Sequence, residues 1–175
     1  MKVGIYGGSF NPIHFGHIGL AEWVVKNTDI DEIWLMVSPN NPLKDSSILV
    51  DEHVRLQEAR VATQHLDSVR VSDFEFSLPR PNYTANTLKK LSQAYTNYEF
   101  TLIIGEDNLN IFTKWRDYSY ILANYRIFVY PRRGNEQSVN ETIAKLQIET
   151  IKELRFLEDA PYYDISSTEL RAKNK

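Results

Sequence analysis

The sequence contains no cysteine, which excludes disulfide bonds and thiolate metal sites. It also lacks an apolar run long enough to span a membrane, and its start, MKVGIYGG, reaches glycine too early for a secretory signal. Basic residues are not in excess, because 20 Lys and Arg stand against 23 Asp and Glu, giving a net charge of −3. A broad basic face for nucleic acid is therefore not expected. We expect a soluble cytoplasmic protein that binds neither nucleic acid nor membrane.

The length of 175 residues and the hydrophobic content of 42% suit one domain, spanning 1–175. Short apolar runs alternate with amphipathic stretches, without an internal repeat. Strands or extended segments are predicted at 2–6, 32–37, 69–76, 99–105, 125–131 and 155–157. Helices are predicted at 15–27, 51–65, 84–95, 108–112, 118–122, 138–152 and 167–172, with Asp51 as a cap.

Strands that are apolar throughout, separated by helices, are typical of a parallel sheet covered on both faces. The predicted fold is α/β, a single Rossmann-like doubly wound domain with a mainly parallel central sheet. Ligands of such sheets bind outside the carboxyl ends of the strands. Three unusual segments, 7–17, 38–44 and 105–115, follow predicted strands, so we expect them to meet there.

The first of these segments belongs to the sequence GIYGGSFNPIHFGH, which ends at His17. Gly7 and Gly8 allow a tight turn and a close approach of the backbone to a ligand. The helix that follows points its amide groups and positive dipole end at the same place. Ser9, His14 and His17 can each donate to phosphate oxygens. This combination predicts a site for a polyphosphate.

Other interpretations of this motif are weaker. The glycine spacing differs from the GxGxxG fingerprint of dinucleotide-binding oxidoreductases, and no GK[ST] follows as in a P-loop. A metal site at His14 and His17 has no third ligand nearby in the sequence. An ordinary packing or capping role for both histidines stays open.

GGSFNPIHFGH resembles the signature GG-[ST]-F-D-P-x-H-x-G-H of the nucleotidyltransferase superfamily that carries an HxGH motif. ISSTELR, about 150 positions later, is similar to the ISSTxxR element of the same superfamily. Within it, PNYTANTL, IIGEDNLNIFTKW and the YPR after the strand at Tyr130 resemble the nicotinate-nucleotide adenylyltransferases, and the resemblance covers nearly the whole chain.

The resemblance implies a transfer of AMP from ATP to nicotinate mononucleotide, which gives nicotinate adenine dinucleotide and pyrophosphate without a covalent intermediate. It implies catalytic roles for His14, His17 and Arg171. It implies that ATP is bound by Gly7, Gly8, Ser9, Phe10, His14, His17, Lys44, Gly105, Asp107, Ile165, Ser166, Ser167, Thr168 and Arg171. Magnesium would travel mainly on ATP oxygens, with no metal site formed by the protein. The expected oligomeric state is a monomer or a homodimer.

For the mononucleotide, Trp115 offers a face to the pyridine ring, and the helix start at Tyr83 and Thr84 can receive the nicotinate carboxylate. Ordinary core packing of Trp115 and simple helix capping by Thr84 are the alternatives.

This sequence departs from the family pattern in three places. Asn11 stands where the family usually has Asp, and NNPLK keeps Lys44 but lacks the histidine of PPHK. The chain also stops soon after Arg171, whereas relatives usually continue with another helix. Either this tail is disordered or cut away, or this member is short with a truncated C-terminal helix. Pantetheine-phosphate adenylyltransferase or another HxGH nucleotidyltransferase is the alternative enzyme, and a catalytically silent nucleotide-sensing module is the alternative of another class.

Overall fold

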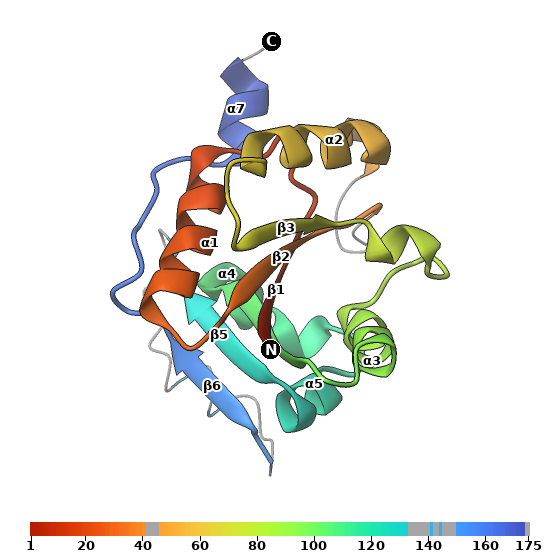
Figure 1. Cartoon of the computed structure of the whole chain (residues 1–175), viewed down its shortest axis with the longest axis vertical. Coiled ribbons are helices and arrows are strands. Elements are labelled where there is room, and N and C mark those ends of the chain that lie inside the picture. Colours follow the sequence, from red (N-terminus) through yellow and green to blue (C-terminus); the bar gives the residue numbers. More distant parts are fainter. Residues whose placement is uncertain (41–45, 133–140, 142–143, 145–149, 174–175) are drawn as a thin grey trace.

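The computed structural model describes residues 1–40, 46–132, 141, 144 and 150–173 (Figure 1). The strands are β1 (Lys2–Gly8), β2 (Glu32–Val37), β3 (Val69–Ser72), β4 (Glu99–Gly105), β5 (Arg126–Tyr130) and β6 (Glu153–Phe156). The α-helices are α1 (Phe15–Asn27), α2 (Glu52–Thr63), α3 (Thr84–Ala94), α4 (Glu106–Asn110), α5 (Tyr118–Asn124) and α7 (Ser167–Lys173). The 3-10 turns are η1 (Ser46–Ile48), η2 (Phe74–Ser77) and η3 (Phe112–Lys114).

The six strands of the described part form one sheet in the order β3-β2-β1-β4-β5-β6. Every neighbouring pair runs parallel, which confirms the predicted fold. The chain reverses its direction of travel across the sheet between β1 and β4, so the switch point lies there. Gly8 ends β1 and Gly105 ends β4, and both therefore stand at this point.

Each face of the sheet has its own helices and its own core (Figure 1). On one face, α1 and α2 pack against strand residues such as Leu35, Ile103 and Phe128. On the opposite face, α3, α4 and α5 cover strand residues such as Ile5 and Leu102. A ligand at the switch point can therefore reach both faces by crossing the ends of β1 and β4.

Several predicted boundaries hold. The predictions for 15–27, 32–37 and 99–105 coincide with α1, β2 and β4. Asp51 caps α2 as predicted, because its side chain accepts from the backbone N–H of His53 at 2.9 Å and of Val54 at 3.3 Å.

The predicted extended segment 69–76 is wrong in its second half. It is a strand only over Val69–Ser72, and η2 follows. Ser72 Oγ accepts from the N–H of Phe74, and the N–H of Phe76 donates to the carbonyl of Asp73. These local hydrogen bonds turn the chain away from the sheet.

One predicted helix differs from the structure, and another cannot be compared with it. The helix predicted at 108–112 is split into α4 and η3, with Ile111 between them. The helix predicted at 138–152 falls largely outside the described residues.

Candidate functional site

Two glycines end β1 at the carboxyl edge of the sheet. A Cβ at Gly7 would meet nothing within 4 Å, so this position faces open space. A Cβ at Gly8 would lie 3.1 Å from the ring of Phe10, which is 2% exposed. Phe10 itself has a φ of 46°, in the left-handed region that residues with a side chain rarely adopt. The Phe10 ring therefore belongs to the core, and any contact with ATP at this position falls to its backbone.

His14 and His17 stack at the start of α1, with ring centroids 3.7 Å apart and planes 23° apart. The backbone N–H of His14 donates to Nδ1 of His17 over 3.2 Å. Because that Nδ1 accepts, a neutral His17 carries its proton on Nε2. Burial, together with the nearby Arg132 guanidinium, lowers the pKa of His14. His14 is therefore mainly neutral at pH 7, and its buried Nδ1 has no hydrogen-bond partner among the described residues.

Gly16, between the two histidines, is required by a close contact. A Cβ there would lie 3.0 Å from Nδ1 of His14 and 3.0 Å from Cγ2 of Ile165. The missing side chain lets the segment that begins at Ile165 lie directly on the start of α1.

The ISSTELR segment joins the first motif through hydrogen bonds to its backbone. Ser167 Oγ donates to the carbonyl of Pro12 at 2.8 Å, and Arg171 Nη1 donates to the carbonyl of Asn11 at 2.6 Å. Arg171 Nη2 also donates to Thr168 Oγ1 at 3.1 Å. The two motifs, 160 positions apart at their farthest contact, therefore form one surface beside the histidine pair.

The start of α7 is closed by a reciprocal cap. The N–H of Ser166 donates to Oε2 of Glu169 at 3.0 Å, and Ser166 Oγ accepts from the N–H of Glu169 at 3.2 Å. This is the capping-box arrangement, and it fixes the direction in which α7 leaves the site.

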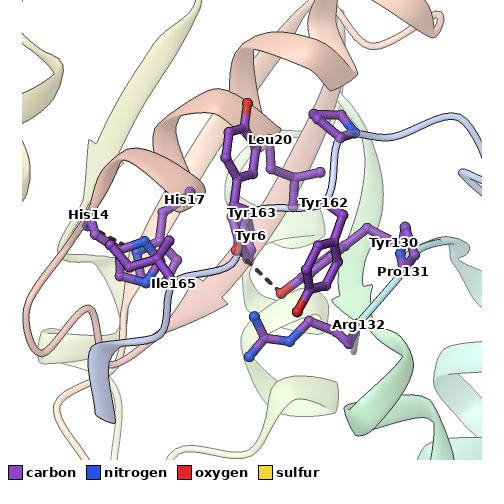
Figure 2. Close-up of a pocket in the computed structure, with 12 residues that line it drawn as sticks. Tyr6, His14, His17, Leu20, Tyr130, Pro131, Arg132, Tyr162, Tyr163 and Ile165 are labelled. Carbon is purple, nitrogen blue, oxygen red and sulfur yellow. Dashed lines mark hydrogen bonds between the residues drawn. The ribbon is translucent and has the colours of Figure 1, made fainter. Parts of the chain in front are cut away.

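Figure 2 shows a narrow cavity between the histidine pair and the end of β5. Tyr6, Tyr130 and Arg132 form one side of it, and Tyr162 contributes from the segment before α7 (Figure 2). Its volume of about 20 Å³ is of the order of one water molecule, too small for a whole nucleotide.

Arg132 is a site residue to which the sequence analysis gave no role. Its Nε lies 3.6 Å from Oδ1 of Asp107, and its backbone N–H donates to Oε2 of Glu106 at 3.0 Å. A Cβ at Gly105 would collide with Oδ1 of Asp107 and would lie 3.0 Å from Cγ of Arg132. Glycine at this position therefore lets the carboxylate and the guanidinium meet beside the small cavity. The YPR sequence was the available signal for this arginine.

A much larger cavity, of about 360 Å³, opens on the face covered by α3 and α5. The three residues predicted for the mononucleotide, Tyr83, Thr84 and Trp115, all line it. Gly7 and Gly8 line it too, although the resemblance assigned them to ATP. Of the two cavities, these glycines line the larger one and not the small one beside the histidine pair.

Trp115 combines packing with exposure to this cavity. Its ring lies 5.0 Å from that of Phe112 at an interplanar angle of 43°, and its buried Nε1 has no hydrogen-bond partner in the described ranges. Tyr83 stands before the first residue of α3, and the Arg116 guanidinium lies 4.9 Å over its ring. The wall thus offers aromatic faces and a cation to a flat, acidic ligand.

Glu75 is a buried acid in the same wall, and the sequence analysis did not identify it. Its Oε1 accepts from Thr87 Oγ1 at 2.7 Å, and its carbonyl accepts from Asn82 Nδ2 at 3.1 Å. Burial raises the pKa of Glu75, although hydrogen bonds from Thr87 and Ser38 oppose the shift. This carboxyl ties α3 to the end of β2 and so helps to shape the cavity.

Arg55 on α2 was also missed, and it holds three loops of the site together. It is 1% exposed, and its Nη1 donates to the carbonyls of Ser9 at 2.6 Å and Ser38 at 2.8 Å. Its Nη2 donates to Pro39 O at 3.0 Å, and its Nε donates to Val50 O at 2.8 Å. These bonds join segments up to 46 positions apart, and no local sequence pattern reveals them.

Asn11, from the first motif, serves the loop rather than an open surface. Asn11 Nδ2 donates to the carbonyl of Ile48 at 3.0 Å, and its Oδ1 accepts from the N–H of Val50 at 3.3 Å. An ionised Asp could not make the first of these bonds. Ser9 Oγ is buried and has no partner among the described residues. Lys44, predicted to bind ATP, lies outside the described residues.

In the described ranges, no group of three or more His, Asp or Glu side chains is placed to hold a metal ion. No helix in the same part of the chain is long and apolar enough to cross a membrane.

A parallel sheet with two motifs joined at its switch point defines a nucleotidyltransferase of the HxGH type. The family model described as cytidylyltransferase-like matches residues 5–173. Two relatives of the chain are each named "Probable nicotinate-nucleotide adenylyltransferase". The one from Flavobacterium psychrophilum is 45% identical over 177 residues, which cover 100% of this chain and 88% of the relative. The one from Bacteroides fragilis is 41% identical over 170 residues, which cover 97% and 80%.

A solved structure of the Plasmodium falciparum nicotinic acid mononucleotide adenylyltransferase, complexed with APC, has the same fold. Its TM-score is 0.76 at 20% identity, and the match covers 98% of this chain and 82% of that one. The chain belongs to the nicotinate-nucleotide adenylyltransferase family within the cytidylyltransferase-like class.

Proposed function

We propose that this chain transfers AMP from ATP to nicotinate mononucleotide, releasing pyrophosphate and forming nicotinate adenine dinucleotide for NAD biosynthesis. The observation that supports the proposal is that two groups of residues predicted to bind substrates lie on opposite faces of the sheet at its switch point. The histidine pair and ISSTELR lie on the α1 face, and the cavity with Trp115 lies on the α3 face. The cytoplasm, which supplies ATP, is the proposed compartment, and the active form is proposed as a monomer or a homodimer.

The reaction needs positioning and charge stabilisation more than proton transfer. A phosphate oxygen of the mononucleotide, already ionised near neutral pH, attacks the α-phosphorus of ATP. The bond from that phosphorus to the bridging oxygen breaks, and its electrons leave with pyrophosphate. Holding two polyanions in line, and stabilising the charge that develops, then provide the catalysis.

The histidine pair supplies donors to the phosphates. In the proposed arrangement, Nε2–H of His17 donates to the α-phosphate, and His14 lies beside the bridging region of the triphosphate. Arg171 binds the β- and γ-phosphates, with the hydroxyls of Ser167 and Thr168 beside it. In this structure the Arg171 guanidinium is bonded to the carbonyl of Asn11 and to Thr168, so ATP would exchange some of these bonds for its own.

For the adenosine half of ATP, Asp107 is proposed to accept a hydrogen bond from a ribose hydroxyl. Gly105, which has no side chain, is proposed to let the backbone approach the adenosine closely. Lys44 and the segment at Ile165 and Ser166 complete the proposed ATP site. Magnesium enters with ATP and is held mainly by phosphate oxygens and water. The side-chain amide of Asn11 is committed to backbone groups, which argues against a direct metal contact there.

For the acceptor, Trp115 is proposed to stack on the pyridine ring, while the amides at Tyr83 and Thr84 receive the carboxylate. A carboxylate there gains charge-assisted hydrogen bonds that a carboxamide cannot match. We therefore expect the acid to be preferred over the amide.

One assay tests the function and its alternatives together. Pyrophosphate release from ATP is measured with nicotinate mononucleotide, nicotinamide mononucleotide and phosphopantetheine in parallel, and CTP replaces ATP in a second series. Release with ATP and nicotinate mononucleotide, exceeding every other pair, supports the proposal. Faster release with phosphopantetheine would indicate the pantetheine enzyme, and no release with any acceptor would indicate a nucleotide-sensing module.

A further inference from the structure

Two tyrosines stand between the two half-sites. Among the described residues that line the small and the large cavity, Tyr6 and Tyr130 alone line both. Tyr6 comes from β1, and Tyr130 is the last residue of β5. β4 lies between these strands, so the two side chains meet across it at the switch point.

The hydroxyl groups of the two tyrosines contact each other. Tyr6 Oη lies 3.3 Å from Tyr130 Oη, and the rings are 5.8 Å apart at an interplanar angle of 71°. Gly105 pairs in register with Tyr130, and a Cβ at this glycine would lie 3.1 Å from Cζ of the Tyr130 ring. The missing side chain therefore makes room for the phenol.

The neighbours of the pair are groups already proposed to meet phosphate, or cations beside them. The Tyr6 ring lies 6.0 Å from the His17 ring, and the Arg132 guanidinium lies 6.0 Å over the Tyr130 ring. Figure 2 shows the two hydroxyls between the imidazoles and this guanidinium. The α-phosphorus of ATP and the attacking phosphate of the acceptor must meet in this region if each substrate occupies its own half-site.

The hydroxyls of both tyrosines are enclosed by protein, although the residues differ in overall exposure. Tyr6 is 6% exposed, whereas Tyr130 is half-buried, and because it lines both cavities it can turn its hydroxyl proton toward a ligand there. Burial raises the pKa of both hydroxyls, so both phenols stay protonated and can donate across neutral pH. A Tyr6 hydroxyl that donates to the Tyr130 oxygen leaves the Tyr130 proton available and strengthens it as a donor.

We propose that the Tyr130 hydroxyl donates a hydrogen bond to a non-bridging oxygen of the α-phosphate, and that Tyr6 is the positioning residue that donates to Tyr130. This inference rests on the proposed function. The phenol keeps its proton throughout, so the reaction stays balanced as written above, with pyrophosphate as the leaving group.

Phenylalanine variants test the assignment, because they remove only the hydroxyls. Tyr130→Phe should lower kcat about 10- to 100-fold, the range for losing one hydrogen bond to a charged group, with both KM values within about twofold of wild type. Tyr6→Phe should lower kcat less. The double variant should be no slower than Tyr130→Phe, because Tyr6 acts through Tyr130.

Tyr125→Phe is the matched control. Tyr125 is 6% exposed, and its hydroxyl lies 3.1 Å from Ser92 Oγ, at the other end of β5. It loses the same chemical group but should keep the wild-type kcat. Circular dichroism checks that each variant folds.

The outcomes separate the two proposals. Two results overturn the role of the pair. One is a wild-type kcat in Tyr130→Phe. The other is a double variant whose fold-loss in kcat is the product of the losses in the two single variants. The same holds if Tyr125→Phe slows the reaction equally. Failure of the unaltered chain to release pyrophosphate with nicotinate mononucleotide overturns the proposed function itself, and this inference with it.

Discussion

The two ends of the sheet treat their charged and polar groups in opposite ways. At the amino end, Arg126 donates to Asp29 at 2.7 Å and to Glu153 at 2.8 Å, and Lys2 donates to Asp29 at 2.6 Å. Six buried polar atoms lack partners among the described residues, and four of them lie at the carboxyl end. These four are Ser9 Oγ, His14 Nδ1, Asn82 Oδ1 and Trp115 Nε1, whereas Trp34 Nε1 and Thr101 Oγ1 lie in the amino halves of β2 and β4.

Buried polar groups are nearly always hydrogen-bonded in folded proteins, so a local cluster of exceptions needs a reason. A ligand that brings its own donors and acceptors explains why these protein atoms have no partner within the protein. The amino end is thus organised to stabilise the fold, whereas the carboxyl end keeps its hydrogen-bonding capacity for substrates. Changes at the carboxyl end should therefore affect turnover, and changes at the amino end should affect stability.

The largest effect is expected from His17→Ala at the carboxyl end. Loss of one donor to the charge developing in the transition state should lower kcat about 10²- to 10³-fold. The melting temperature should change little, because the His17 side chain is half-buried at the start of α1, where it accepts from the N–H of His14, and lies outside the two hydrophobic cores. Steady-state kinetics and thermal unfolding measure the two quantities. A folded variant with unchanged kcat would remove His17 from the mechanism.

Trp115→Ala should have the next largest effect, and it should act on binding. Stacking on an aromatic ring contributes about 1–3 kcal/mol, so KM for nicotinate mononucleotide should rise about 5- to 150-fold. KM for ATP should stay within about twofold. Circular dichroism must show a folded variant, because Trp115 also packs on Phe112. A raised KM for ATP with an unchanged acceptor KM would mean that the two half-sites are assigned in reverse.

The fold could be predicted from the sequence because its signals are local. β2 and β4 are unbroken apolar runs between polar turns, and α1 begins where HFGH ends a proline-bearing loop. The pairing of ISSTELR with the first motif followed from a family resemblance, and its contacts to Asn11 and Pro12 agree with that pairing. The roles of the individual site residues stay predictions.

What the sequence did not reveal depends on distant contacts. Arg55 resembles any arginine on an amphipathic helix, and its role appears only when three separated loops present their carbonyls to it. Tyr6 and Tyr130 are 124 positions apart, in runs that are typical of buried strands. η2 was missed for a different reason, because two hydrogen bonds between residues close in sequence outweighed the β-propensity of its phenylalanines.

Arg126→Met tests the amino end. It retains an apolar stem but removes the ion pairs with Asp29 and Glu153, whose side chains are 43% and 40% exposed. Because these partners are partly solvated, the free energy of unfolding should fall by about 1–3 kcal/mol rather than by the full cost of breaking a buried pair. Urea denaturation measures the change. A variant of unchanged stability but reduced kcat would break the division between the two ends.

The smallest effect is a change in pH dependence at Asp29. Hydrogen bonds from Arg126 and Lys2 hold the pKa of this carboxyl well below its ordinary value. The stability that it contributes is therefore fully present above the unfolded pKa of about 3.9, and it is lost as the pH falls toward the lower folded pKa.

Asp29→Asn removes this titration. The variant should be less stable than wild type at pH 7, and the difference should shrink below about pH 4. Urea unfolding at a series of pH values tests this, with Asp31→Asn as the control, because Asp31 accepts from the backbone N–H of Lys2 rather than from Arg126. Parallel curves for wild type and Asp29→Asn, or an equal convergence in the control, would show that the ionic cluster does not set the acid limit of the fold.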